Sequence, residues 1–200
     1  MWRWQGESAI VVTFDGPLEH ANAQARAAAT AARARRDVTA ATPGARTVLA
    51  HLTGDADPDA VARDLQRTVA SPAARPSREH RIGVVYDGDD LAALSREIGL
   101  SEPAIVALHA GARYTVAFLG FMPGFAYLLG LPPPLRVPRL ETPRTRVPAG
   151  SVAIAGEWAG VYPTASPGGW RLLGRTDARL FDPASGAALA AGDHVHFEAS

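Results

Sequence analysis

The stretch that decides the fold runs from Phe118 to Thr176 and begins Phe118-Leu-Gly-Phe-Met-Pro-Gly-Phe-Ala-Tyr127. It continues through Pro138-Arg139 and Pro143-Arg144 to Ser166-Pro-Gly-Gly-Trp170. Glycine and proline recur too often here for a long helix, yet aromatic and arginine side chains stand between them where a disordered linker has Ser, Lys and Glu. We therefore predict an ordered, loop-rich surface, which is the usual setting of a binding site.

The composition limits the chemistry that this surface can perform. All 20 basic residues among the 200 are arginine, and the chain has no cysteine. The missing lysine excludes a phosphate-binding lysine of the Walker type, a Schiff-base lysine and a lysine that carries biotin or pyridoxal phosphate. The missing cysteine excludes disulfides, a thiolate nucleophile and Cys-ligated zinc.

The charge balance bears on partners and location. The 20 acidic residues cancel the 20 basic ones, so no overall field attracts nucleic acid or an anionic membrane. No apolar run approaches the roughly 20 residues that cross a bilayer, and the N-terminus lacks the apolar core of a signal peptide. We expect a cytoplasmic protein with neither nucleic-acid nor membrane partners.

The first 80 residues predict a small N-terminal α/β domain. Apolar and β-branched runs predict strands, and helical spacing of Ala and Val predicts helices. The expected order is strand, helix, strand, helix, over Ala9–Phe14, Leu18–Arg36, Thr47–Leu52 and Asp57 to about Val69. A proline-punctuated segment, Ser71–His80, then marks a domain boundary, giving domains of residues 1–78 and 79–200.

The rest of the chain predicts many short strands with two helices. Asp89-Asp90 starts one helix, which Gly99 ends, and Ser101 caps another through Leu108. Strands are expected at Arg81–Tyr86, Arg113–Phe118, Ser151–Ala155, Gly160–Tyr162, Trp170–Leu173 and His194–Phe197. Such a series indicates a closed or nearly closed β-barrel with helices at its side, so the fold class is α+β.

Four arginines are candidates for binding an anion. Arg139 and Arg144 each follow a proline, Arg146 lies just beyond, and Arg175 stands in a Gly-Arg-Thr run. A guanidinium fork on a restricted backbone suits carboxylate or phosphate. The alternative, which the sequence leaves open, is that they pair with nearby acids such as Glu141 and Asp177.

Aromatic residues and histidines supply the other candidates. Tyr127, Tyr162 and Trp170 combine an apolar ring with a polar group, and at least one of them is expected to be only packing. His109 ends a predicted helix just before the strand that enters the central stretch, and its role is either structural or catalytic. His194 and His196 share one face of a strand, but no third ligand converges on them, so we predict no metal site.

The motifs together resemble the KipI and PxpB family, also called allophanate hydrolase subunit 1. The resemblance is carried by Tyr114-Thr-Val, Gly120-Phe-Met-Pro-Gly-Phe, Pro138-Arg139, Pro143-Arg144, Val147-Pro-Ala-Gly-Ser-Val, Tyr162-Pro163, Ser166-Pro-Gly-Gly-Trp170 and Gly174-Arg-Thr. It is dense from about Ile82 to Phe197 and weaker before. It implies a small N-terminal α/β domain followed by a cyclophilin-like β-barrel domain.

The resemblance also implies partners and an activity. Family members join a KipA- or PxpC-type companion subunit and a PxpA-type (LamB/YcsF) protein in a bacterial 5-oxoprolinase, which uses ATP with Mg to open 5-oxoproline, a small molecule, to glutamate. We therefore assign catalytic roles to His109, Arg144 and Tyr162. Substrate or anion binding is assigned to Arg139, Arg146, Trp170 and Arg175.

Two other functions are consistent with the same resemblance. KipI itself inhibits autophosphorylation of a histidine kinase, which would make this chain a regulator without turnover. Related domains form the carboxyltransferase part of urea carboxylase. If the chain is instead a 5-oxoprolinase subunit, we expect an enzyme subunit that is inactive without its companions.

Overall fold

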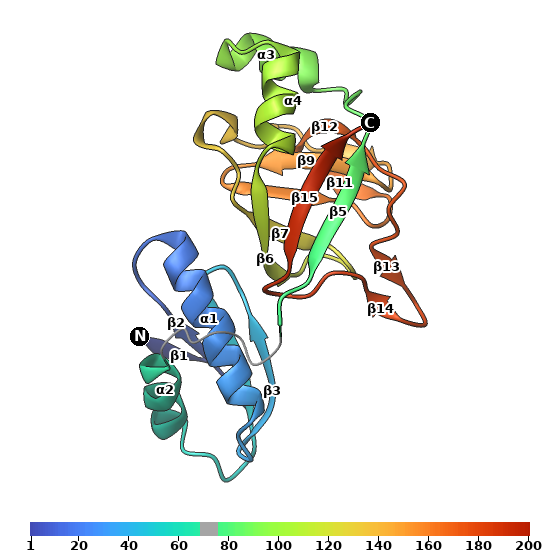
Figure 1. The fold of residues 1–200 in the computed structure, drawn as a ribbon. Helices are drawn as coiled ribbons and strands as arrows, with labels where there is room; N and C mark the ends of the chain where they lie inside the picture. The colour runs from blue at the N-terminus through green and yellow to red at the C-terminus, as the bar shows by residue number, and fades with distance from the viewer. Residues whose placement is uncertain (69–75) are drawn as a thin grey trace. The chain divides into compact units, whose positions relative to one another are not determined.

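The computed structural model describes residues 1–68 and 76–200, and the chain divides into two compact units, Met1–Ser77 and Arg78–Ser200 (Figure 1). Val69 and the first part of the proposed boundary segment lie outside the described residues. No helix in the described ranges has the length and apolarity to span a membrane. The two units are described separately below.

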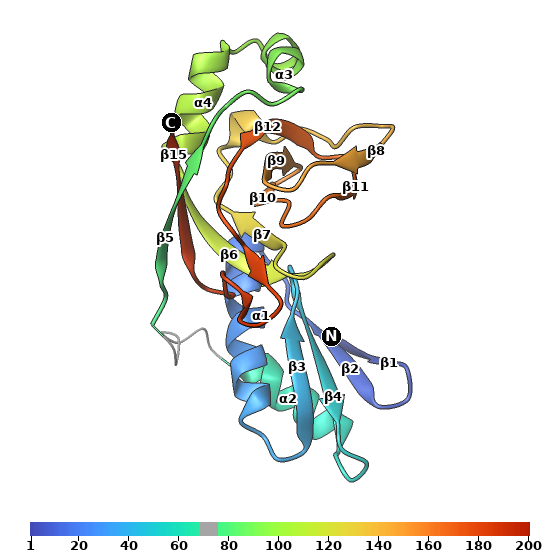
Figure 2. The ribbon, with the colours of Figure 1, turned by 90° about the vertical axis from the view of Figure 1, so that its right-hand side faces the viewer.

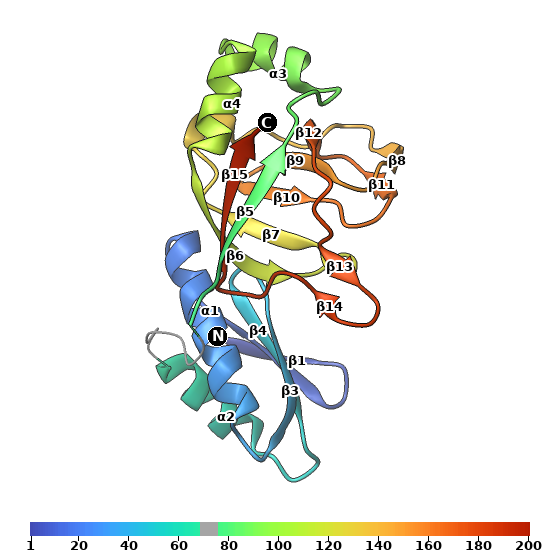
Figure 3. The ribbon, with the colours of Figure 1, turned by 45° about the vertical axis from the view of Figure 1, so that its right-hand side comes forward.

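The first unit is a four-stranded antiparallel sheet with two helices on one face (Figure 3). The sheet order is β1-β2-β4-β3. In chain order the elements are β1 (Trp2–Gln5), β2 (Ala9–Thr13), α1 (Leu18–Arg33), β3 (Val38–Pro43), β4 (Thr47–Leu52) and α2 (Pro58–Arg67).

Helix packing in this unit follows the sequence pattern. The alanines of α1 that recur at helical spacing are buried against the sheet, together with Val61 and Leu65 of α2. Asp57 caps α2 by accepting from the backbone N–H groups of Asp59 and Ala60. The predicted order is incomplete, because it lacks β1 and β3. Both are edge strands: β1 is largely exposed, and half of the side chains of β3 are exposed, so neither shows a continuous apolar run.

The second unit is built around a curled seven-stranded sheet in the order β12-β9-β10-β7-β6-β15-β5 (Figure 2). Only the β15–β5 pair is parallel. The elements are β5 (Glu79–Val84), α3 (Leu91–Ile98), α4 (Glu102–Ala110), β6 (Arg113–Leu119), β7 (Ala126–Leu129), the 3₁₀ turn η1 (Pro133–Leu135), β8 (Arg144–Val147), β9 (Ser151–Ala155), β10 (Trp158–Val161), β11 (Ser166–Gly168), β12 (Arg171–Arg175), β13 (Phe181–Asp182), β14 (Gly186–Ala187) and β15 (His194–Ala199).

The two edges of this sheet meet where the chain leaves β5, and the N–H groups of Gly88 and Asp90 then donate to Leu173 and Leu172 of β12. Val85, just after β5, and Arg175, at the end of β12, form an isolated antiparallel bridge with two backbone hydrogen bonds of 2.9 Å. The sheet is therefore a nearly closed barrel, and the predicted α+β class is confirmed. The stretch from Phe118 to Thr176 holds more strand than expected, because β7, β8 and β11 were not predicted.

The helices of this unit begin and end where the sequence indicated. Gly99 ends α3 in the left-handed conformation, with φ of 69°. The hydroxyl of Ser101 caps α4 by accepting from the N–H of Ala104. Both helices cover one end of the barrel beside β12 and β15 (Figures 1 and 3).

Candidate functional site

A cavity of about 240 Å³ in the second unit is walled mainly by aromatic rings. We call it the aromatic pocket. Its lining consists of Phe121, Phe125, Tyr127, Arg139, Pro143, Tyr162, Pro167, Gly168, Gly169 and Trp170. Three of the seven residues that the sequence assigned to a site, Arg139, Tyr162 and Trp170, are thus brought together.

Phe125 is the centre of the aromatic wall. Its ring meets those of Tyr127, Tyr162 and Trp170 edge to face, with centroids 5.1, 5.4 and 5.3 Å apart. Edge-to-face contact is a favourable arrangement because the positive edge of one ring meets the negative face of another. The wall is therefore a fixed surface against which a flat ligand can pack.

Phe121 lies at the edge of this pocket in a costly conformation. It is the non-glycine residue with positive φ (70°) among the described residues, and 63% of its surface is exposed. Its loop is held by hydrogen bonds from Gly120 N–H to Phe125 C=O and from Phe125 N–H to Met122 C=O, both 3.1 Å. Left-handed backbone at a bulky residue, like an exposed ring, is typical of functional sites. Phe121 was not among the predicted site residues, because the backbone preferences of phenylalanine do not indicate a positive φ.

The loop that carries Arg139 is attached to the opposite wall. Leu140 N–H donates to the carbonyl of Gly169 at 2.7 Å, next to Trp170. The side chain of Arg139 is exposed and makes no ion pair with the described residues. Its guanidinium is therefore available to a ligand.

Tyr162 places a phenol at the floor of the pocket. Its side chain is 1% exposed. Burial raises the pKa of Tyr162, while the N–H of Trp170 and the charge of Arg144 act in the opposite direction. The phenol therefore stays protonated at neutral pH and can act as a hydrogen-bond donor.

Arg144 lies on β8, where it pairs in register with the lining residue Gly168. It is not itself among the lining residues, but its charge acts on the pKa of Tyr162. Its Nη2 donates to Asp90 Oδ1 at 2.7 Å, and this hydrogen bond raises the pKa of Arg144. Its Nη1 is buried and has no partner among the described residues. A buried donor without a partner costs about 1–3 kcal/mol. A ligand oxygen that accepted a hydrogen bond from Nη1 would remove this cost. Arg144 pairs with Asp90. It does not pair with Glu141 or Asp177, the acids that the sequence suggested.

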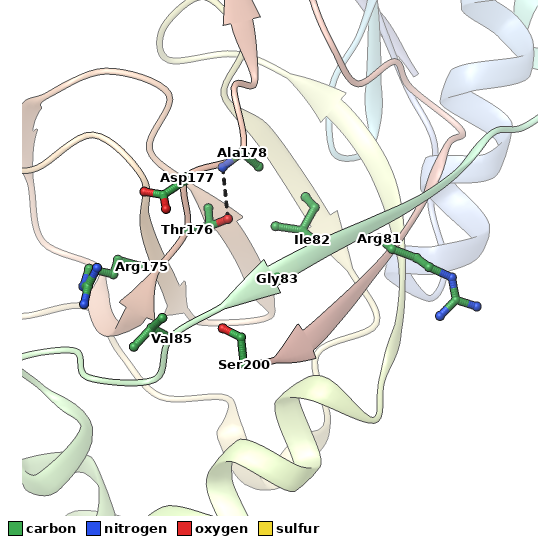
Figure 4. Close-up of a pocket in the computed structure, with 9 residues that line it drawn as sticks. All are labelled: Arg81, Ile82, Gly83, Val85, Arg175, Thr176, Asp177, Ala178 and Ser200. Atoms are coloured by element: carbon green, nitrogen blue, oxygen red, sulfur yellow. Dashed lines mark hydrogen bonds between the residues drawn. The ribbon is translucent and has the colours of Figure 1, made fainter.

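The other predicted site residues lie elsewhere. Arg146 is exposed on β8 and lines neither cavity. Arg175 donates to Asp87 Oδ2 at 2.9 Å and lines a second cavity (Figure 4). His109 is 0% exposed, with Nδ1 2.7 Å from the Tyr86 hydroxyl. The roles assigned to these three residues stay predictions.

The histidines of β15 have separate partners. His194 contacts Thr115 Oγ1 at 3.2 Å, and His196 contacts Glu79 Oε2 at 3.1 Å. His80 contacts Asp193 Oδ2 at 3.1 Å. Within residues 1–68 and 76–200, no three His, Cys, Asp or Glu side chains are grouped as metal ligands would be.

Replacing Gly168 with alanine is expected to displace Tyr162. A Cβ at Gly168 would lie 2.3 Å from the Tyr162 hydroxyl oxygen and 2.9 Å from Cζ, and overpacking of this kind costs about 1–3 kcal/mol. Thermal unfolding measures the loss, and adding Tyr162→Phe should restore part of it because the closest atom is removed. Gly54→Ala, where nothing lies within 4 Å, is the control. An unchanged melting temperature for Gly168→Ala contradicts this packing.

The family of the chain is shown by sequence comparison. The family model for the carboxyltransferase domain, subdomain C and D, matches residues 1–190. The chain belongs to this family, which confirms the resemblance to the KipI and PxpB group.

Three individual proteins show what the chain is similar to within and beyond this family. A 5-oxoprolinase subunit of Escherichia coli O157:H7 is 43% identical over 205 residues, covering 96% of this chain and 92% of the relative. The crystal structure of TTHA0988 is 35% identical with a TM-score of 0.83, but this chain spans only 40% of its length. The urea carboxylase of Kluyveromyces lactis shares the fold, with a TM-score of 0.69 at 19% identity over 21% of that chain.

Proposed function

We propose that the chain is a subunit of an ATP-dependent 5-oxoprolinase and contributes one side of a shared active site. The observation that carries the proposal is the aromatic pocket lined by Arg139, Tyr162 and Trp170, with Arg144 near enough to Tyr162 for its charge to act on the pKa of the phenol. The similarity to the 5-oxoprolinase subunit of Escherichia coli supports it. Because 5-oxoproline is a small flat lactam with a carboxylate, it has one group for each part of this site.

In this proposal each wall recognises a different part of the substrate. The guanidinium of Arg139 binds the carboxylate, as planar forks do. The lactam ring packs against the rings of Phe125 and Trp170, and the protonated Tyr162 phenol donates to the lactam oxygen. Arg144 Nη1 stabilises negative charge as the amide bond opens.

The aromatic pocket does not fit Mg–ATP. Its lining has no carboxylate to hold Mg²⁺ and no lysine, and its volume of about 240 Å³ lies below the roughly 300–1,000 Å³ of ligand sites. We therefore assign this chain no step in nucleotide binding, and place ATP with the companion subunits. Those companions are of the KipA/PxpC and PxpA types.

The experiment is reconstitution with these companion subunits, followed by an assay of glutamate formed from 5-oxoproline and ATP. We expect glutamate from the complete set and none when this chain is omitted. Glutamate formation that is independent of this chain contradicts the proposal. The same assay separates it from a KipI-like inhibitor, whose omission would not abolish turnover.

Arg139→Ala is expected to raise KM for 5-oxoproline about 10- to 100-fold, because a hydrogen bond between charged groups contributes about 1.5–3 kcal/mol. Arg144→Ala should lower kcat as well, since its role is in the transition state. Arg179→Ala, which breaks only an exposed pair with Asp182, is the matched control. Unchanged 5-oxoproline-dependent ADP release in Arg144→Ala, with assembly intact, removes Arg144 from the site.

A further inference from the structure

Strand β5 has one free edge. The carbonyls of Arg78 and Val84 accept from His194 and Ser200 of the β15 side, at 2.8 and 3.0 Å. In a parallel pair both backbone groups of a residue point to the same side, and alternate residues point to opposite sides. The even-numbered residues of β5 therefore face β15, and Glu79, Arg81 and Gly83 face away from it.

No described strand pairs with those three residues. The barrel closes at the Val85–Arg175 bridge and through the hydrogen bonds from Gly88 and Asp90 to β12. On the β5 side of the bridge the chain after β12 turns away. Thr176 N–H donates to Gly150, and the Thr176 hydroxyl accepts from Ala178 N–H at 3.2 Å (Figure 4). The opening is a cavity of about 320 Å³, which we call the seam, lined by Arg81, Ile82, Gly83, Val85, Arg175, Thr176, Asp177, Ala178 and Ser200.

Gly83 lies at the seam, on the free edge of β5. Glycine inside a strand is unfavourable because it has no side chain to pack. Here the chain itself gives no reason for it, because φ is ordinary and a Cβ would meet nothing within 4 Å. Figure 4 shows Gly83 facing the Thr176–Ala178 side across the opening.

The charges at the seam favour a basic occupant. Arg81 is paired with Glu198 at 2.6 Å, and Arg175 is paired with Asp87 at 2.9 Å. Asp177 is exposed and makes no ion pair with the described residues. The remaining uncompensated charge at the opening is therefore negative.

We propose that the companion subunit adds an extended strand to the β5 edge, with a basic side chain facing Asp177. This inference rests on the proposed function. Unpaired N–H and C=O groups in a row bind an extended backbone, which is the mode called β-augmentation. A polypeptide is favoured as occupant because TTHA0988, which matches this chain throughout, carries far more chain than the matched 40%.

Amide hydrogen exchange tests the inference directly. In the free chain we expect fast exchange at Arg81 and Gly83 and slow exchange at His80, Ile82 and Val84. Adding the KipA/PxpC-type subunit should slow Arg81 and Gly83 at least tenfold. Continued fast exchange at both residues in the assembled complex overturns the inference.

Two variants measure what the edge contributes to binding. Gly83→Pro removes an outward N–H without touching the β15 ladder, whereas the control Gly83→Ala keeps it. We expect Gly83→Pro to raise the Kd for the companion at least tenfold, and Gly83→Ala to leave it within about twofold. Asp177→Arg, an exposed change that leaves the β5 backbone intact, should also weaken binding and covers the case in which Gly83→Pro fails to fold.

The outcomes are distinguishable. If wild-type chain does not bind the companion, the proposed assembly fails and the inference fails with it. If wild type binds and Gly83→Pro and Asp177→Arg bind equally well, only the seam inference is overturned. Protection of Arg81 and Gly83 that grows with the concentration of the isolated chain would assign the edge to a second copy, and this too overturns it.

Discussion

Replacing Asp90 with alanine is expected to lower the free energy of unfolding by about 3–5 kcal/mol, the usual cost of removing one partner of a buried ion pair. The carboxylate is 8% exposed and uses both oxygens. Oδ1 accepts from Arg144 Nη2 and Oδ2 from the N–H of Leu172, each at 2.7 Å. Its loss leaves a guanidinium and a buried backbone donor without partners.

Denaturant unfolding measures this loss. Asp89→Ala is the control, because Asp89 is exposed and lies at the same helix terminus, so it reproduces the helix-dipole effect of up to about 1 kcal/mol. If Asp90→Ala lowers the free energy of unfolding by less than about 1 kcal/mol, Asp90 does not stabilise the fold through its contacts with Arg144 and Leu172.

A double-mutant cycle with Arg144→Ala isolates the pair itself. If the two side chains interact as the geometry indicates, the double variant is more stable than the sum of the single losses predicts. In the reconstituted enzyme, Asp90→Ala should also lower kcat in the way that Arg144→Ala does, since the hydrogen bond that holds the Arg144 guanidinium is lost. Additive losses of stability would contradict a direct interaction between Asp90 and Arg144.

Local signals in the sequence were sufficient for most elements of the second unit. As predicted, α3 begins after Asp90 and ends at Gly99, and α4 begins after Ser101. Strand β9 also spans the predicted residues, Ser151–Ala155. Two of the missed strands, β8 and β11, depend on a partner that is not the next strand in the chain. β8 and β11 pair only with each other and contain a register shift, so neither shows a regular alternation of apolar residues.

The site was predictable where its residues share a stretch of sequence. Arg139, Tyr162 and Trp170 were identified because a rigid, loop-rich segment carries them all. Asp90 was identified only as a helix start, since 54 residues separate it from Arg144 and no periodicity links them. Contacts of this kind are set by barrel closure, which a local pattern does not encode.

A second large effect is expected from His109 when the pH falls. The imidazole stacks on Phe197, with ring centroids 4.6 Å apart, and its Nε2 has no partner among the described residues. Burial lowers the pKa of His109 to about 3, from an ordinary value of 6.5. The folded chain therefore keeps this ring neutral where the unfolded chain protonates it.

The sign of the pH dependence follows from proton binding. Below pH 6.5 the unfolded state binds one more proton at His109 than the folded state does, so stability decreases as pH falls and is fully present above that value. The slope approaches about 1.4 kcal/mol per pH unit, which amounts to about 2.3 kcal/mol between pH 6.5 and 4.5 and about 2.6 kcal/mol between pH 7 and 4.5. At the lower end of this window Glu79 and Asp37 begin to contribute as well, because Arg113 and Arg35 lower their pKa values in the folded chain, and this contribution is common to wild type and variant.

The double variant Tyr86→Phe/His109→Leu tests this assignment, because it removes both partners of the 2.7 Å hydrogen bond and leaves neither polar atom unpaired. The other five histidines are present in both proteins, so any contribution from them cancels in the difference between wild type and variant. Urea unfolding from pH 7 to 4.5 should show the variant losing about 2.6 kcal/mol less than wild type. Equal losses would mean that His109 is protonated in the folded chain, and a proton-transfer role for it in the enzyme would then become tenable despite its burial.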